Sequence, residues 1–231
     1  MARSRHTQVL TMFPDLQLYQ ANLDISRAES DRLWHLLSED ERSRVERYKH
    51  EQSKRNFIAA RGNLREILAP RLGCESREIE FGYGDRGKPY IKNPQNQEKL
   101  FFNLAHSRDW AIYALCSDRE VGIDLEYINL QCDVERIAKR YFLPSEQKII
   151  SSLNNHDKYF AFYRAWTLKE AYGKATGEGI ANILDVVNIT PLLISDKTLQ
   201  IHNWTLKLLN SGIDLDLDSN YAAAIAIRNH L

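Results

Sequence analysis

The sequence predicts an α+β fold. Segments with helical periodicity and segments with strand-like alternation follow one another without the regular strand–helix–strand order of parallel α/β proteins. An apolar, small-residue strand pattern at 109–115 returns at 220–227, almost half a chain length later. The 231 residues, 43% of them hydrophobic, are enough for a sizeable buried core. We therefore expect either two duplicated α+β units, each closed by one of these strands, or one continuous α+β domain.

The overall composition excludes several classes of protein. The 31 basic and 31 acidic side chains cancel, so no overall positive field attracts nucleic acid or an anionic membrane. No apolar run approaches the roughly 18 residues of a membrane span. The three cysteines are widely spaced, which argues against a disulfide framework or a zinc site. We expect a cytoplasmic protein that binds neither nucleic acid nor membrane.

The balanced total charge hides an asymmetry along the chain. Residues 1–117 carry 19 basic and 16 acidic side chains, whereas residues 118–231 carry 12 basic and 15 acidic side chains. The boundary between these segments follows the first of the two repeated strand patterns. We predict an N-terminal half at 1–117 and a C-terminal half at 118–231.

Helix and strand patterns can be assigned along both halves. Ser26 and Ser38 each precede a glutamate at the third following position, as in a capping box, and so predict two helix starts. Pro70 is expected to end a long third helix. That third helix covers 53–68, and further helices are predicted at 133–142, 145–153 and 157–176. The predicted strands cover 17–23, 101–104, 110–116, 121–126 and a β-like tail from 186 onward.

The glycine-rich run at 82–87 matches the letters of a dinucleotide-binding motif. That motif requires a helix to begin at the glycines. Pro89 and its β-favouring neighbours follow instead, so we predict a hairpin at 80–91 and a polar loop at 93–99.

Two carboxylates share one face of the predicted strand at 121–126. Asp124 and Glu126 alternate with Ile123 and Leu125, so the acidic pair points away from the apolar pair. A solvated strand face would tolerate this arrangement. A hard divalent cation such as Mg²⁺ is the other explanation, because it prefers oxygen ligands.

A helical segment at 162–174 carries further charged residues. Trp166, Glu170 and Lys174 are four residues apart and lie on one helix face. An ordinary surface pair between Glu170 and Lys174 accounts for this pattern. A metal-bound diphosphate would also require an acidic and a basic group side by side.

A third group of candidate residues is basic. Residues 41–65 carry eight lysines and arginines against three glutamates, and Lys88 and His106 follow further along the chain. A solvated helix face explains most such clusters. A small ligand with several phosphates would explain the residue types equally well.

Taken together, these segments resemble those of one enzyme family. The sequences VGIDLE at 121–126 and WTLKEAYGK at 166–174, about 40 residues apart, are similar to the paired signatures of Sfp-type 4′-phosphopantetheinyl transferases. The segments at 87–89 and 102–107 resemble two further family motifs. The resemblance implies two similar α+β halves in a pseudo-twofold arrangement, each a small antiparallel sheet packed with helices, in a monomer.

The resemblance also implies an activity. Family members transfer the phosphopantetheine arm of coenzyme A to a serine of an apo carrier protein and release adenosine 3′,5′-bisphosphate. Asp124, Glu126 and Glu170 match the magnesium ligands of the family, and Mn²⁺ is an alternative cation. Glu170 would accept the serine proton directly or through water. The implied phosphate contacts are Lys169 and Lys174 at the diphosphate, both with catalytic roles, and Lys88, Arg44, Arg55 and His106 at coenzyme A.

The partner implied by the resemblance is an acidic acyl, peptidyl or aryl carrier protein. Residues 128–142 combine apolar and basic side chains and are a candidate docking surface, although an ordinary core helix would have the same pattern. Two other functions stay open. One is a different Mg²⁺-dependent phosphoryl or nucleotidyl transferase, and the other is a non-catalytic module that binds coenzyme A or a carrier protein.

Overall fold

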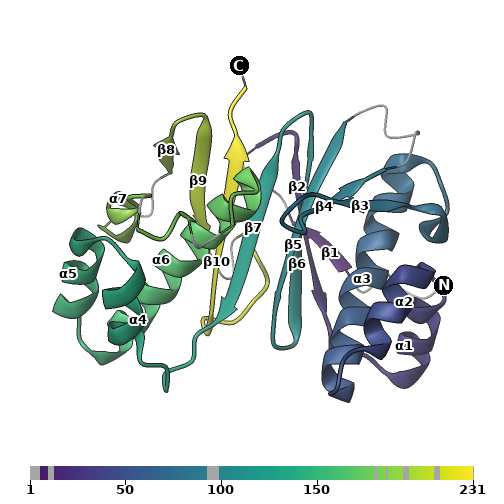
Figure 1. The fold of residues 1–231 in the computed structure, drawn as a ribbon, viewed down its shortest axis with the longest axis horizontal. Helices are drawn as coiled ribbons and strands as arrows, with labels where there is room; N and C mark the ends of the chain where they lie inside the picture. Colours follow the sequence, from purple (N-terminus) through teal and green to yellow (C-terminus); the bar gives the residue numbers. More distant parts are fainter. Residues whose placement is uncertain are drawn as a thin grey trace.

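The protein consists of two α+β halves that lie side by side (Figure 1). The computed structural model describes residues 6–9, 13–92, 99–179, 182–185, 187–194, 198–210 and 214–230. Each half contains a four-stranded antiparallel sheet with helices over its outer face. The inner faces of the two sheets pack on each other through a shared apolar core that includes Leu18, Ile112, Ile123 and Ile225. The predicted fold class is confirmed.

The first half is built from residues 6–117. Its sheet has the order β1-β2-β6-β5, and a small hairpin of β3 and β4 lies beside it. The strands are β1 (His6–Val9), β2 (Leu16–Asn22), β3 (Phe81–Tyr83), β4 (Pro89–Ile91), β5 (Leu100–Ser107) and β6 (Trp110–Ser117). The helices are α1 (Arg27–Trp34), α2 (Glu39–Glu46) and α3 (Glu51–Leu72), followed by the 3₁₀ turn η1 (Ser76–Glu78).

The second half repeats this construction. Its sheet has the order β7-β10-β9-β8. The strands are β7 (Val121–Tyr127), β8 (Leu199–Ile201), β9 (Trp204–Leu209) and β10 (Tyr221–Arg228). The helices are α4 (Val134–Tyr141), α5 (Pro144–Ser152), α6 (Asn155–Thr176) and α7 (Thr190–Ile194).

The two halves share one topology. In each, the first long strand pairs with the last strand, which pairs in turn with the strand before it: β2-β6-β5 and β7-β10-β9. The longest helix of each half has 22 residues and ends at a glycine with left-handed backbone angles, Gly73 after α3 and Gly177 after α6. The structure therefore favours the duplicated unit over one continuous domain.

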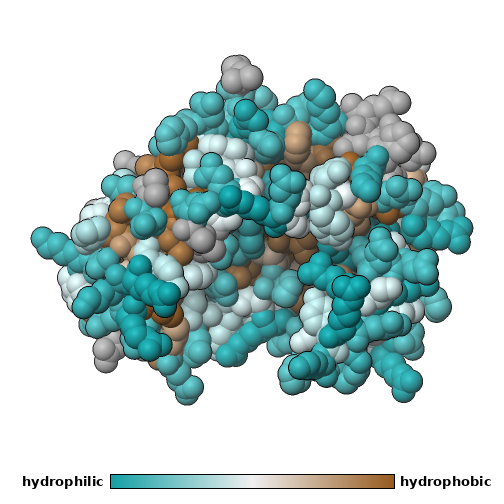
Figure 2. Space-filling view, viewed as in Figure 1, coloured by the Kyte–Doolittle hydropathy of each residue, from teal (hydrophilic) through white to brown (hydrophobic). Residues whose placement is uncertain are grey.

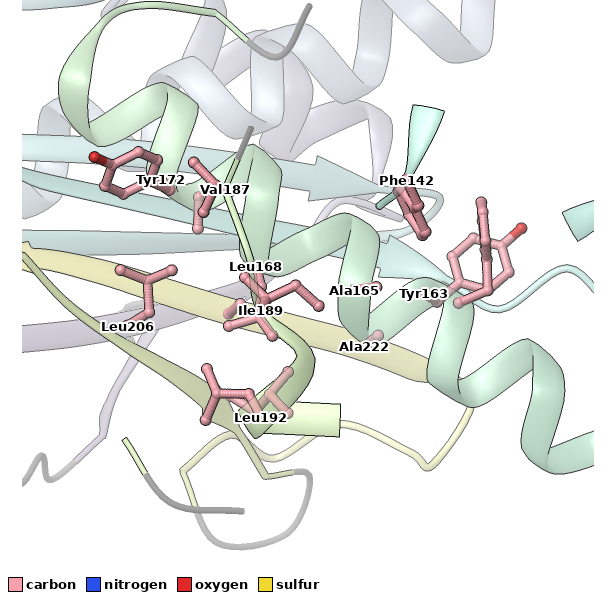
Figure 3. Packing of buried hydrophobic residues seen from close by; sticks show 14 of the residues in the cluster. Phe142, Tyr163, Ala165, Leu168, Tyr172, Val187, Ile189, Leu192, Leu206 and Ala222 are labelled. Carbon is pink, nitrogen blue, oxygen red and sulfur yellow. The ribbon is translucent and has the colours of Figure 1, made fainter. Parts of the chain in front are cut away.

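Helix α6 is the centre of the second half. Its apolar side chains, such as Leu168 and Ala165, face β10 and are closed over by Ile189 and Leu192 (Figure 3). A second contact is made by backbone atoms, because a Cβ on Gly122 of β7 would lie only 2.2 Å from the Ala171 carbonyl oxygen. The glycine therefore allows α6 to lie directly on β7, and this brings the two signature segments together.

Most predicted elements are present, with two corrections. Helix α3 continues through Pro70 to Leu72, because a proline in the last turn removes only one backbone donor while the buried face of the helix continues. The β-like tail is predicted to begin at residue 186, but the structure has helix α7 at Thr190–Ile194 and its strands begin only at Leu199. Pro191 occupies the first turn of α7, where the lost N–H has no helical acceptor. The predicted loop at 93–99 falls almost entirely outside the described residues.

The local turn and cap predictions are also present. Ser38 and Glu41 form a complete capping box at α2, and Ser26 accepts the Glu29 backbone N–H at α1. The glycine-rich run forms the β3–β4 hairpin, in which Gly87 has a φ of 80°. A dinucleotide-binding helix at this position is thereby excluded.

Candidate active site

A cleft between the two halves contains most of the predicted site residues. One cavity of about 230 Å³ is lined from the first half by residues 86–89 with Asn103, and from the second half by Glu170 and Lys174. A second cavity of about 250 Å³ is lined by Arg44, Arg61, His106 and again Lys174. Both cavities include Leu104 and Lys174, so we treat them as one cleft. Figure 2 shows one face of the molecule as largely hydrophilic, with hydrophobic residues near its middle and over the second half.

Asp124 lies at the centre of the site. Its side chain is buried, and its Oδ1 accepts a hydrogen bond of 2.7 Å from Lys174 Nζ. Its other oxygen, Oδ2, is buried without a hydrogen-bond partner among the described residues. Burial raises the pKa of Asp124, and the Lys174 ammonium acts in the opposite direction. Asp124 therefore does not lie on a solvated strand face. Lys174 bonds this buried carboxylate, so an ordinary surface pair with Glu170 does not account for it.

Glu126 and Glu170 complete a group of three carboxylates. Burial and then the negative charge of Asp124 raise the pKa of Glu126 to about 7. Burial, and then the negative charge of Asp124, also raise the pKa of Glu170. Each glutamate thus repels Asp124, which is the electrostatic situation that a bound cation relieves. Among the described residues, no three His, Cys, Asp or Glu side chains are yet arranged closely enough to hold a metal ion.

The opposite wall of the cleft is basic. His106 is exposed at the surface of the cleft, and partial desolvation by the surrounding atoms and then the charge of Lys174 lower its pKa. The Arg44 guanidinium lies 5.3 Å from the centre of the Phe57 ring. Arg61 is 93% buried on its side chain, pairs with Glu41 at 3.3 Å, and keeps its Nη1 without a hydrogen-bond partner in the described structure. This wall can accept an anion.

Lys88 connects the two halves at the edge of the cleft. Its Nζ donates to the Ala175 carbonyl at 2.8 Å, in the last turn of α6, and to the Val121 carbonyl at 3.3 Å. Burial lowers the pKa of Lys88 to about 8. The lysine follows the hairpin turn at Gly87 and lines the same cavity as Glu170, so the hairpin brings it to the cleft.

Two predicted site residues lie elsewhere. Lys169 is fully buried, and its ammonium bonds Glu146 at 2.9 Å and the carbonyl oxygens of Leu184 and Val187. Its three donors are therefore used inside the second half, and its side chain does not reach the cleft. Arg55 lines a separate cavity beside α1 and bonds Gln52. The structure brings neither residue to the cleft.

Comparison with known proteins identifies the family. A family model described as the 4′-phosphopantetheinyl transferase superfamily matches residues 120–226, and a model of the N-terminal part of such transferases matches residues 24–118. A 4′-phosphopantetheinyl transferase, HetI, of Nostoc sp. strain PCC 7120 is 38% identical over 94% of this chain and 90% of its own length. The chain belongs to the 4′-phosphopantetheinyl transferase family. The resemblance seen in the signature segments is confirmed.

More distant relatives of this transferase carry the same activity in their names. The 4′-phosphopantetheinyl transferase Sfp of Bacillus subtilis strain 168 is 26% identical over 75% of this chain and 76% of its own length. An L-aminoadipate-semialdehyde dehydrogenase-phosphopantetheinyl transferase of Xenopus laevis is 26% identical over 81% of this chain and 67% of its own length. Among the described helices of this transferase, none is long and apolar enough to cross a membrane.

The sequence left three residues of this transferase site without a role. Arg61 lies on the basic wall, and Asn103 and Ser107 of β5 contact β7. Asn103 and Ser107 are polar positions on one face of a strand whose other polar residue, His106, points to the opposite face, and this is the signal that could have identified them. Arg61 lies in a basic helix, where the sequence does not distinguish it from its neighbours; it is buried like Arg65 but, unlike Arg65, lines the cleft.

Proposed function

We propose that this transferase moves the 4′-phosphopantetheine arm of coenzyme A to a serine of an apo acyl, peptidyl or aryl carrier protein. The reaction depends on Mg²⁺ and releases adenosine 3′,5′-bisphosphate. The observation that supports this most directly is the cleft, in which Glu170 of one half, and Lys174 with its buried partner Asp124, face basic residues of the other half. A metal-bound polyphosphate requires both kinds of group at once.

Asp124, Glu126 and Glu170 suit a divalent cation. The unpartnered Oδ2 of Asp124 and the raised pKa values of both glutamates leave oxygen ligands whose repulsion a cation would offset. When bound, Mg²⁺, or Mn²⁺ in its place, neutralises charge on the diphosphate. Lys174 holds Asp124 in the structure, and we expect its ammonium to turn to the diphosphate instead.

The chain supplies the groups for proton transfer and charge stabilisation. The serine oxygen forms a bond to the phosphorus that carries pantetheine, while the bond from that phosphorus to the bridging oxygen breaks. The electron pair leaves with adenosine bisphosphate, where Lys174 stabilises the new charge. The serine proton passes to Glu170, directly or through water, and burial together with the charge of Asp124 raises the pKa of Glu170 and so makes its carboxylate a stronger base.

The remaining phosphates of coenzyme A are assigned to the basic wall. Arg44 and His106 bind the 3′-phosphate, and Lys88 lies near the diphosphate. Arg55 and Lys169 are left out of this assignment because neither reaches the cleft. In this proposal residues 1–117 bind the phosphates of coenzyme A, and residues 118–231 hold the cation and the carrier protein.

A surface on α4 and the loop before it suits the carrier protein. Leu130 is 52% exposed, Ile137 and Tyr141 are partly exposed, and Lys139 and Arg140 lie beside them. An apolar patch with basic neighbours is complementary to an acidic helical partner. Ile128 and Phe142, which the sequence grouped with this surface, are buried in the core instead. We expect the enzyme to act as a monomer in the cytoplasm.

A mass measurement tests the proposed reaction. The protein is incubated with coenzyme A, Mg²⁺ and a panel of apo carrier proteins, and each carrier is then weighed by mass spectrometry. We expect one or more carriers to gain the phosphopantetheine arm, with equimolar release of adenosine 3′,5′-bisphosphate. Transfer from a nucleoside triphosphate instead would favour a different phosphoryl or nucleotidyl transferase. Binding of coenzyme A without any transfer would favour a non-catalytic module.

The 3′-phosphate provides a second prediction. Charge-assisted hydrogen bonds to a phosphate contribute roughly 1.5–3 kcal/mol each, so 3′-dephospho-coenzyme A should bind roughly 10- to 150-fold more weakly than coenzyme A. In His106→Ala or Arg44→Ala this preference should shrink, because the contact is already lost. Calorimetric affinities for both donors and each variant form a double-mutant cycle. An unchanged preference in His106→Ala would show that His106 does not contact this phosphate.

A further inference from the structure

Strand β7 is an edge strand, and its free edge meets the first half. Its ladder partner is β10, so the backbone groups on its other side need different partners. Ile123 N–H donates to Asn103 Oδ1 at 2.9 Å, and Tyr127 N–H donates to Ser107 Oγ at 3.0 Å. Side chains of β5 thus take the place of a backbone ladder.

These two hydrogen bonds fix a register between the halves. Asn103 and Ser107 are four residues apart on β5, and their partners Ile123 and Tyr127 are four residues apart on β7. The two strands therefore run in the same direction at a constant offset. Asp124 and Glu126 lie between the two anchored positions, so the position of both carboxylates relative to β5 is set by this pair of bonds.

Ser107 also contacts a carboxylate, that of Glu126. Its Oγ accepts the Tyr127 N–H and lies 3.3 Å from Glu126 Oε2, to which it donates. A hydroxyl has one proton. Because the Ser107 oxygen accepts the Tyr127 N–H, its own proton is free to point toward the Glu126 carboxylate. Glu126 has three rotatable side-chain bonds and is repelled by Asp124, so without this hydroxyl its carboxylate is expected to turn away from Asp124.

We propose that Ser107 is a positioning residue that holds Glu126 in place for the divalent cation. The inference rests on the proposed function, because it assumes that the three carboxylates bind that cation. Ser107 itself touches neither the cation nor the donor in this assignment. It acts from the half that binds the phosphates on a ligand in the other half, and so couples the alignment of the two halves to cation binding.

The test measures cation affinity directly. Mn²⁺ is titrated by calorimetry into the full-length protein saturated with coenzyme A and without a carrier protein. Ser107→Ala should bind Mn²⁺ roughly 10- to 100-fold more weakly than the wild type, as is typical when a group behind a metal ligand is lost. Ser107→Thr, which keeps the hydroxyl, should recover most of that loss. Coenzyme A affinity measured in chelator should not change in either variant.

Thr205→Val is the matched control. Thr205 also lies on a strand, and its hydroxyl bonds Asn229 and Gln200 far from the cleft, so its loss should leave Mn²⁺ affinity unchanged. Hydrogen exchange of the Tyr127 amide in the metal-free protein gives a second readout, which should be faster in Ser107→Ala alone. Wild-type Mn²⁺ affinity in Ser107→Ala would overturn the role of Ser107 and leave the metal site standing. Absence of Mn²⁺ binding in the wild type would overturn both.

Discussion

Replacing Asp124 or Glu170 by alanine is expected to lower turnover by more than roughly 100-fold, which exceeds the loss typical of groups that only support a metal ligand. Asp124 is buried at the centre of the carboxylate group, and Glu170 is both a ligand and the proposed base. Turnover is measured as adenosine 3′,5′-bisphosphate released per enzyme. Chelator should silence the wild type, and Mg²⁺ should restore it.

Asp157→Ala is the control for this prediction. Asp157 lies on the same helix as Glu170 but is exposed in the first turn, so its removal should leave turnover near the wild-type value. Circular dichroism of each variant shows whether the fold is retained. Full transfer activity of the wild type in chelator, or of Asp124→Ala in Mg²⁺, would remove the basis for the metal assignment.

Two lysines of one helix should give opposite phenotypes. Lys169→Met removes the charge partner of buried Glu146 and the donor to two carbonyl groups, and breaking such a buried pair costs roughly 3–5 kcal/mol of unfolding free energy. Lys174→Ala also takes the charge partner from buried Asp124, but Lys174 is 32% exposed and lines the open cleft, so water can take its place and the loss of stability should be smaller. This variant should instead lower turnover by roughly 100- to 1,000-fold, as for other lost charge-stabilising donors.

Chemical unfolding and steady-state kinetics of both variants test this contrast. Lys148→Met, a change at an exposed lysine of α5, controls for loss of positive charge and should alter neither quantity. A Lys169→Met protein with wild-type stability and greatly reduced turnover would return Lys169 to the active site. The same kinetic loss in a destabilised protein that recovers at low temperature would agree with a structural role.

The sequence was sufficient for the fold class because its local signals agree with its tertiary structure. The serine caps and the turn at Gly87 are each satisfied by neighbours within a few residues. Pro70 and α7 were misjudged because burial of a helix face, which depends on distant residues, outweighed the local signal. Such burial is not visible in a window of ten residues.

The site was only partly predictable for a related reason. Glu170 and Lys169 are adjacent in the same signature, yet a helix turns by about 100° per residue, and so one faces the cleft and the other the core. A short motif marks both as important without separating catalysis from stability. Ser107 was missed because its role depends on Tyr127 and Glu126, which reach it only through the packing of the two halves.

The shared topology also sets an order of events during synthesis. In each half the first long strand pairs with the last, across about 100 residues, so neither sheet can close until its end has been translated. The first half is complete once Ser117 leaves the ribosome, whereas β7 must wait for β10. If the first half folds in that interval, Lys88, Asn103 and Ser107 are already in position to bond β7. The contacts that align the two halves of the finished enzyme would then also cover one edge of the newly made β7, whose unpaired backbone groups could otherwise pair with another chain and aggregate.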